Sequence, residues 1–182
     1  SSHEVQRRRG ISLLKLGFPA AIALEALIKV SNDQGQYSLI DRTGATAAYT
    51  SEAALPWAGS RTGTNYACGA NTMVGPGVVE ALGDTFEDTE ESELPLEERL
   101  LMCLEAAQAT GGDNRGRQSA AIQIHWKRID ANPYLDLRVD DHPNPIPDLR
   151  AVVHIYRQTY PRYSSITWPE MKGTGGYPIL YP

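Results

Sequence analysis

Cysteine is scarce in this sequence, since only Cys68 and Cys103 occur among 182 residues. One possible pair excludes both a disulfide-rich scaffold and a cysteine-rich metal site. Free cysteine behaves as a small hydrophobic residue, so we expect both thiols to be buried and unpaired. Such usage fits a cytoplasmic protein, because the reducing cytoplasm disfavours disulfides.

Long hydrophobic runs and an excess of positive charge are also missing. The longest apolar run covers residues 18–24 and is interrupted by Glu25. It is far shorter than the roughly 20 residues that a membrane-spanning helix needs. The 17 Lys and Arg residues against 22 Asp and Glu residues give a net charge of −5, and only residues 7–9 break the acidic average. We therefore expect neither a membrane nor a nucleic acid as partner.

What is present is the composition of a folded domain. Hydrophobic residues make up 41% and charged residues 21%, which excludes an intrinsically disordered chain. Residues 161–182 differ, because prolines and glycines interrupt their aromatic residues without any period, and such a segment forms no core of its own. We predict one domain over residues 1–160 and an extended arm over residues 161–182, lying on a neighbouring surface such as another subunit of a homo-oligomer.

Hydrophobic periodicity predicts a mixed order of helices and strands. Helices are expected over residues 11–30 with a break at Gly17, from about Val78 to Gly111 in two parts, and over residues 147–158. Strands are expected at 37–41 and 45–50, joined as a hairpin, and at 66–73, from 122 onward and at 134–140, with a loop at 57–63. This order is typical of an α+β layered domain rather than of a doubly wound fold.

No strong motif for a metal, a phosphate or a catalytic triad occurs. The histidines at positions 3, 125, 142 and 154 are scattered, and neither a glycine-rich phosphate loop nor a Gly-x-Ser-x-Gly elbow is present. We therefore expect no metal site and no cofactor.

The first polar cluster that remains covers residues 111–119. It brings Asp113, Arg115, Gln118 and Ser119 together before a predicted strand, where a rigid scaffold can aim catalytic groups. Such a loop could bind a carboxylate or orient an amide through Arg115 and Gln118. The alternative is a helix cap followed by a solvated turn.

A second cluster lies on the predicted strand 134–140 and just after it. Asp136, Arg138 and Asp140 share one face of that strand, which is the pattern of a salt-bridged solvent face. Asp140 or Asp141 beside His142 could also orient the imidazole. Their roles stay open.

The third candidate is the first residue. Ser1 carries an α-amino group, which is a base near neutral pH and lies close enough to its own hydroxyl to activate it. A trimmed chain end is the alternative explanation of a serine at this position.

Five segments carry a more specific pattern: residues 10–17, 50–59, 66–75, 111–120 and 134–143. In this order they resemble the family called domain of unknown function 1028, which is generally placed in the N-terminal-nucleophile (Ntn) hydrolase superfamily. The resemblance implies a four-layer αββα sandwich of antiparallel sheets and an enzyme that hydrolyses an amide bond of a small molecule. It also implies that Asn71 takes the place of the oxyanion-stabilising asparagine of that superfamily.

Family members usually carry about 45 further residues ahead of this start, and without them a sheet would expose an unpaired edge. We therefore expect a separate N-terminal chain, cut from a precursor immediately before Ser1, to complete the fold. Ser1 would then be the autoproteolytic nucleophile. In the superfamily the nucleophile normally begins a central strand, whereas here a polar stretch and a helix follow Ser1.

The chain departs from the family pattern at three places. Ser60 stands where histidine is common, Ala54 where cysteine is frequent, and Gly69-Ala70 where Gln-Gly precedes the asparagine. These changes surround an expected pocket wall, so we expect the substrate to be particular to this protein.

Three hypotheses follow. In the first, Ser1 and Asn71 are catalytic in an amidohydrolase, and His3, Asp113, Arg115, Gln118 and Ser119 bind the small-molecule amide. In the second, the same fold is a non-catalytic ligand-binding or assembly module. In the third, the nucleophile is Ser119 or Thr50. Convergence of Ser1, Asn71 and residues 113–119 on one pocket would favour the first.

Overall fold

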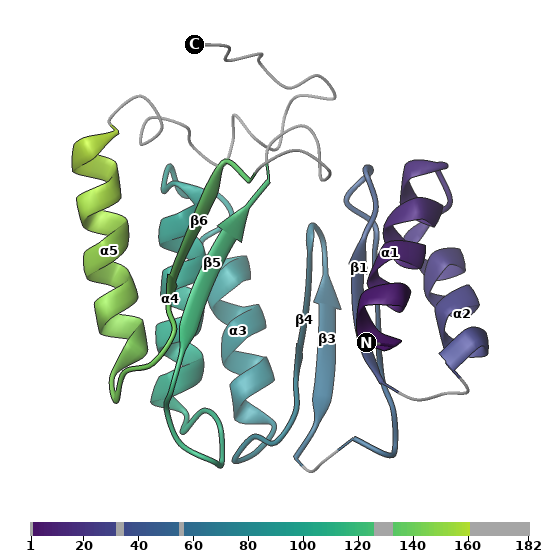
Figure 1. Ribbon diagram of the computed structural model, residues 1–182, viewed down its shortest axis with the longest axis horizontal. Helices are drawn as coiled ribbons and strands as arrows, with labels where there is room; N and C mark the ends of the chain where they lie inside the picture. Colours follow the sequence, from purple (N-terminus) through teal and green to yellow (C-terminus); the bar gives the residue numbers. More distant parts are fainter. Residues whose placement is uncertain (1, 32–34, 55–56, 126–132, 161–182) are drawn as a thin grey trace. The chain divides into compact units, whose positions relative to one another are not determined.

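The computed structural model describes residues 2–31, 35–54, 57–125 and 133–160, with the side chains of Ser2 and His3 left out. These residues form five helices and six strands, and each pair of strands is a small antiparallel sheet (Figure 1). The predicted α+β class is confirmed at this level. The predicted arm over residues 161–182 lies outside the described residues.

Two compact units are distinguished. One comprises Ser1–Asp84 and Ala107–Arg115, and the other comprises Thr85–Ala106 and Gly116–Pro182. The single domain over residues 1–160 stays a prediction. None of the described helices is both long and apolar enough to span a bilayer.

The first unit begins with two helices, α1 (Ser2–Lys15) and α2 (Ala20–Ser31). Helix α1 starts well before the predicted helical turns at residue 11. The carboxylate of Glu4 pairs with Arg7 at 3.0 Å and with Arg8 at 2.8 Å, the i,i+3 and i,i+4 spacings that support a helix. Hydrogen bonds from Arg7 and Arg8 lower the pKa of Glu4 to about 2.

Strands β1 (Gln36–Ile40) and β2 (Thr46–Thr50) form the predicted hairpin, with Gly44 at positive φ in its turn. One face of this hairpin packs on α2. The shared core consists of Ala20, Ala23, Leu24, Leu27 and Leu39, with Tyr37, Ala47 and Tyr49 around them. The opposite face carries Gln36, Ser38, Thr46, Ala48 and Thr50, with the exposed Ile40 at its end.

Strands β3 (Gly59–Gly63) and β4 (Tyr66–Ala70) form a second hairpin. The prediction of a loop at residues 57–63 is therefore wrong for its larger part. Residues 59–63 have no hydrophobic alternation, so their own sequence does not mark a strand. They form one only by pairing with β4. The ring of Tyr66 lies over Gly63, where an added Cβ would collide with it.

Both sides of the second hairpin are held within the first unit. On one side, Thr46 of β2 donates its hydroxyl to the carbonyl of Gly63 at 3.0 Å. On the other side, Arg61 of β3 lies over Gly83 of α3 (Gly77–Asp88) and donates to the carbonyl of Glu80 and to Asp84. The hairpin is therefore held by β2 on one side and by α3 on the other.

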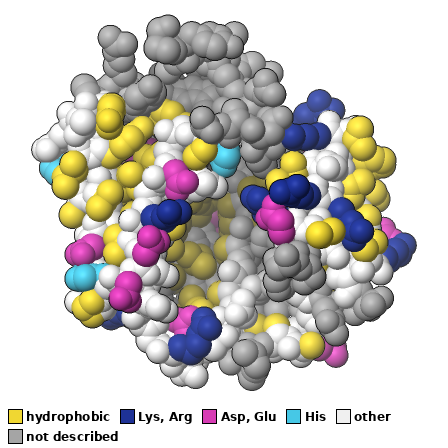
Figure 2. All heavy atoms as spheres, viewed as in Figure 1, with side chains coloured by type: hydrophobic (Ala, Val, Ile, Leu, Met, Phe, Trp, Pro, Cys, Tyr) yellow, Lys and Arg dark blue, Asp and Glu magenta, His cyan; other side chains and the backbone are white. Residues whose placement is uncertain are grey.

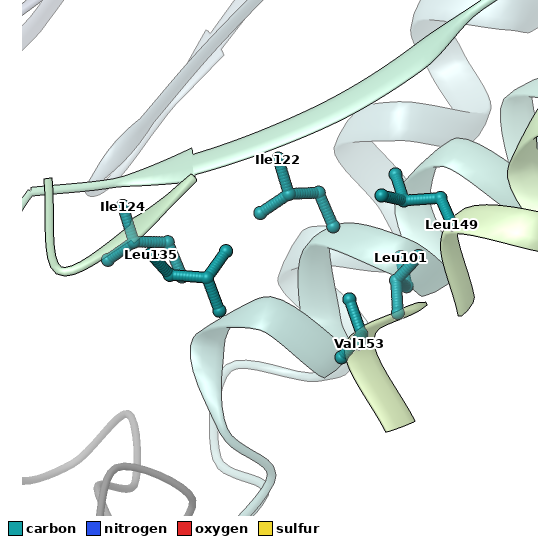
Figure 3. Close-up of a cluster of buried hydrophobic side chains, with 6 residues drawn as sticks. All are labelled: Leu101, Ile122, Ile124, Leu135, Leu149 and Val153. Atoms are coloured by element: carbon teal, nitrogen blue, oxygen red, sulfur yellow. The ribbon is translucent and has the colours of Figure 1, made fainter. Parts of the chain in front are cut away.

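The second unit contains α4 (Leu96–Ala109) up to Ala106, together with β5 (Ala120–Ile124), β6 (Leu135–Val139) and α5 (Pro145–Thr159). Its core consists of six buried side chains that meet between the sheet and the helices: Leu101, Ile122, Ile124, Leu135, Leu149 and Val153 (Figure 3). Arg150 of α5 donates to Glu98 and Glu105 of α4, which fixes the two helices at their rim. The predicted alternation of β6 is confirmed, because Leu135 is buried while Asp136 and Arg138 are exposed.

Candidate functional site

The chain turns sharply where β4 ends. Asn71 follows the strand directly, and Thr72 has a φ of 60°. Left-handed backbone is uncommon outside glycine and is strained for a β-branched residue. Such strain gathers at functional sites, where the surrounding structure must hold it.

Two other segments hold this turn in place. The amide of Met73 donates to the carbonyl of Trp57 at 3.0 Å, and the amide of Trp57 donates back to the carbonyl of Met73 at 3.2 Å. From the other direction, the amide of Asn114 donates to the carbonyl of Thr72 at 2.8 Å. Residues 71–73 and 113–115, which we call the Asn71 corner, are thus adjacent although they lie far apart in the sequence.

Glycines make this approach possible. Gly111 and Gly112 follow α4 with φ values of 118° and 68°, and the amide of Val74 donates to the carbonyl of Gly112 at 3.1 Å. A Cβ on Gly111 would overlap the side chain of Val74. The predicted helix end at Gly111-Gly112 therefore also brings Asp113 and Arg115 to the Asn71 corner.

The side chain of Asn71 is exposed, and its orientation is fixed at both ends of the amide. Its Nδ2 donates to Oε1 of Gln36 at 3.2 Å, and its Oδ1 accepts from the hydroxyl of Thr72 at 3.3 Å. Nδ2 carries two hydrogens. Within the described part of the chain the second hydrogen has no acceptor, so a ligand can take it.

Gln36 holds Asn71 and was not singled out from the sequence. Its Nε2 lies within 3.1 Å of three acceptors: the hydroxyl of Thr50 and the carbonyls of Gly59 and Ala70. Because these hydrogen bonds fix Nε2, the other amide atom of Gln36, Oε1, faces Asn71. The only signal in the sequence is a polar amide on the strand face opposite Tyr37 and Leu39, which is a weak one.

Asp113 and Arg115 form a closed pair at the same corner. Nε and Nη2 of Arg115 donate to the two carboxylate oxygens at 3.0 and 2.6 Å, and the Arg115 amide donates to Oδ1 at 2.8 Å. Hydrogen bonding to Arg115 holds the pKa of Asp113 below its usual range. The pair uses two of the five guanidinium N–H donors, so Arg115, whose side chain is 71% exposed, can still donate to an anionic group.

The remaining predicted site residues are placed elsewhere or not described. Ser1 and the side chain of His3 lie outside the described residues. Gln118 and Ser119 are exposed and belong to the second unit, where the carbonyl of Gln118 accepts the amide of His142. Thr50, the alternative nucleophile, accepts a hydrogen bond from Gln36.

The second sequence cluster is a solvent face. Nε of Arg138 lies 3.4 Å from Asp140, and Asp136 accepts a hydrogen bond from Gln123 of β5. His142 lies 3.3 Å from the carboxylate of Asp148. Among the residues that the structure covers, no group of three or more His, Cys, Asp and Glu side chains could hold a metal ion.

Of the residues that depart from the expected family pattern, Ser60, Gly69 and Ala70 lie on paired strands, whereas Ala54 lies outside the strands. Ser60 pairs with Gly69 and Gly59 pairs with Ala70, in the last two rungs of the β3–β4 ladder before Asn71. The ring of Trp57 lies over Gly59, where a Cβ would overlap it. The departures at Ser60, Gly69 and Ala70 therefore alter one continuous strip beside the Asn71 corner.

Replacing Thr72 with glycine tests whether the corner is strained. The left-handed backbone costs glycine nothing, so Thr72→Gly is expected to raise the free energy of unfolding by about 1 kcal/mol after the entropy cost of glycine. It also removes the hydroxyl that donates to Asn71. Urea unfolding measures the change, and a lower stability of the variant would contradict a strained Thr72.

Comparison with known proteins identifies a family. The protein-family model described as "Family of unknown function (DUF1028)" matches residues 2–149 of the sequence. Among solved structures, the chain is similar to a protein of the same family from Silicibacter pomeroyi, with a TM-score of 0.70 and 24% sequence identity over 87% of this chain and 70% of that one. Among curated proteins, none matches.

Proposed function

Since the chain belongs to the DUF1028 family, whose function is unknown, we propose that it is a hydrolase of the Ntn type that cleaves an amide bond of a small molecule. In this proposal the fold is a four-layer αββα sandwich, completed by an N-terminal chain cut from the same precursor. The mature enzyme acts in the cytoplasm as a homo-oligomer.

The proposed reaction divides the work among three groups. The hydroxyl oxygen of Ser1 attacks the amide carbonyl while the α-amino group of Ser1 accepts the hydroxyl proton. The free N–H of Asn71 stabilises the oxyanion that forms. The α-amino group returns the proton to the leaving amine, and water then hydrolyses the acyl-serine ester.

The observation that carries this proposal is the hydrogen bonding of the Asn71 side-chain amide. An oxyanion donor must be oriented before the reaction and must keep a hydrogen free for the substrate. Asn71 meets both conditions, since Gln36 and Thr72 bond it on either side and leave one N–H available within the described residues. Arg115, fixed by Asp113 at the same corner, can bind a negatively charged part of the substrate.

Ligand binding without catalysis is a second candidate. The observation in its favour is that α1 begins at Ser2, so a helix rather than a strand follows Ser1. A binding module requires the Asn71 corner and Arg115 but no nucleophile. The two candidates differ in their need for a processed N-terminus.

The deciding experiment is mass spectrometry with N-terminal sequencing on protein expressed from the full gene, untagged at this end. Self-processing predicts a chain that begins at Ser1 and a second, smaller chain that co-purifies with it. The Ser1→Ala precursor is expected to remain uncut. A single uncut chain from the native gene would overturn the proposal, and normal cleavage of the Ser1→Ala precursor would exclude self-cleavage.

A further inference from the structure

A second candidate site lies in the first unit, between helices α1 and α2. A groove of about 460 Å³ opens there, within the ~300–1,000 Å³ range of small-molecule sites. Its wall is mainly apolar and includes Val5, Leu13, Leu27 and Val30. Val5 is 47% and Val30 is 53% exposed, so large hydrophobic side chains face the solvent along the groove.

The rim of the same groove is positively charged. Arg8 and Arg9 line it, in an otherwise acidic chain. Helix α1 carries three arginines and Lys15 against one acid, Glu4. Figure 2 shows Lys and Arg side chains beside hydrophobic ones over this helix pair.

The charges at the rim are only partly neutralised. Glu4 accepts hydrogen bonds from both Arg7 and Arg8, so a single carboxylate serves two guanidinium groups. No described residue forms an ion pair with Arg9. The groove therefore offers a cation next to apolar surface that is open to water.

From this combination we infer that the groove binds an aliphatic carboxylate, such as a medium-chain fatty acid, with its chain between α1 and α2 and its head on Arg8 and Arg9. The wall offers apolar contact and few polar groups that could pair with the backbone amides of a peptide, which favours a hydrocarbon chain. Residues of both helices line the groove, which suits a single chain lying between them. The inference is independent of the hydrolase proposal, because it uses none of the residues of the Asn71 corner.

Calorimetric titration of the full-length protein with dodecanoate, kept below its micellar concentration, tests the site. Binding is expected, and dodecanol, which has the same chain length without the charge, should bind roughly tenfold more weakly. The double variant Arg8→Gln/Arg9→Gln should lose a similar factor for dodecanoate and none for dodecanol. Ala26→Phe, which fills the groove without altering its charge, should abolish binding of both.

Arg138→Gln, an exposed arginine on β6 of the second unit, is the matched control and should bind dodecanoate like the native chain. Circular dichroism confirms that each variant is folded. Dodecanoate binding that is absent, or that survives both the arginine variants and Ala26→Phe, would overturn the inference. So would binding to phosphatidylglycerol vesicles without binding of soluble dodecanoate, which would indicate a membrane surface instead.

Discussion

Replacing Asn71 with alanine is expected to lower kcat for amide hydrolysis by about 10²–10³, the usual cost of removing one oxyanion donor. The variant loses the free Nδ2–H but keeps the backbone of the corner, since the bonds from Asn114 to Thr72 and between Trp57 and Met73 involve only main-chain atoms. KM should change little, because the lost hydrogen bond strengthens in the transition state. Steady-state kinetics on an amide found by substrate screening gives both constants.

Asn114→Ala is the matched control for this measurement. Asn114 is an exposed asparagine of the same corner, and its contribution there is its backbone amide, which alanine retains. Its kcat should stay near that of the native enzyme, while Ser1→Ala should abolish activity. If Asn71→Ala retains kcat within twofold, Asn71 is not the oxyanion donor.

Gln36 should act through Asn71 as a positioning residue. In Gln36→Glu a carboxylate oxygen still accepts from Asn71, but the Nε2 donor to Gly59 and Ala70 is lost, so the amide is held less firmly. We expect a smaller loss in kcat than for Asn71→Ala. Combined with Asn71→Ala, the change should add little, because both substitutions act on one interaction.

The largest expected loss of stability comes from Arg99→Ala. Arg99 is 0% exposed, although arginine is almost never fully buried without partners. Its Nη2 donates to the carbonyl of Phe86 at 2.6 Å, its Nε donates to the hydroxyl of Thr89 at 3.0 Å, and its guanidinium lies 4.0 Å from the centre of the Phe86 ring. Burial lowers the pKa of the group.

These contacts close the C-terminal end of α3. The carbonyl of Phe86 lies in the last turn, where carbonyls lack helical partners and a positive charge is favourable. Alanine at position 99 leaves this carbonyl without its guanidinium donor and opens a cavity under the Phe86 ring. We expect a loss of about 3 kcal/mol in the free energy of unfolding, measured by urea denaturation.

Arg99→Met separates charge from volume. Methionine fills most of the space and avoids burying a charge, so it should cost about 1 kcal/mol. The exposed Arg138→Gln should change stability by less than about 0.5 kcal/mol. An Arg99→Ala protein as stable as Arg138→Gln would show that the buried guanidinium contributes nothing net.

Much of the fold could be predicted because its signals are local. The hairpin of β1 and β2 follows from alternation on either side of Gly44, and β6 follows from the alternation of apolar and polar side chains between residues 134 and 140. The family was likewise recognised from short segments. Strand β3 could not be predicted, because Gly59–Gly63 has no hydrophobic period and is a strand only through its pairing with β4.

The sequence by itself therefore determined the α+β class, most elements and the residue types available for chemistry, among them Asn71, Asp113 and Arg115. The tertiary structure decided which of them meet. It placed Gln36 against Asn71, and it joined residues 71–73 to residues 113–115 while Gln118 and Ser119 went to the second unit. Those junctions depend on backbone hydrogen bonds such as Asn114 to Thr72, and since every residue but proline has the same backbone donor, no sequence pattern marks them.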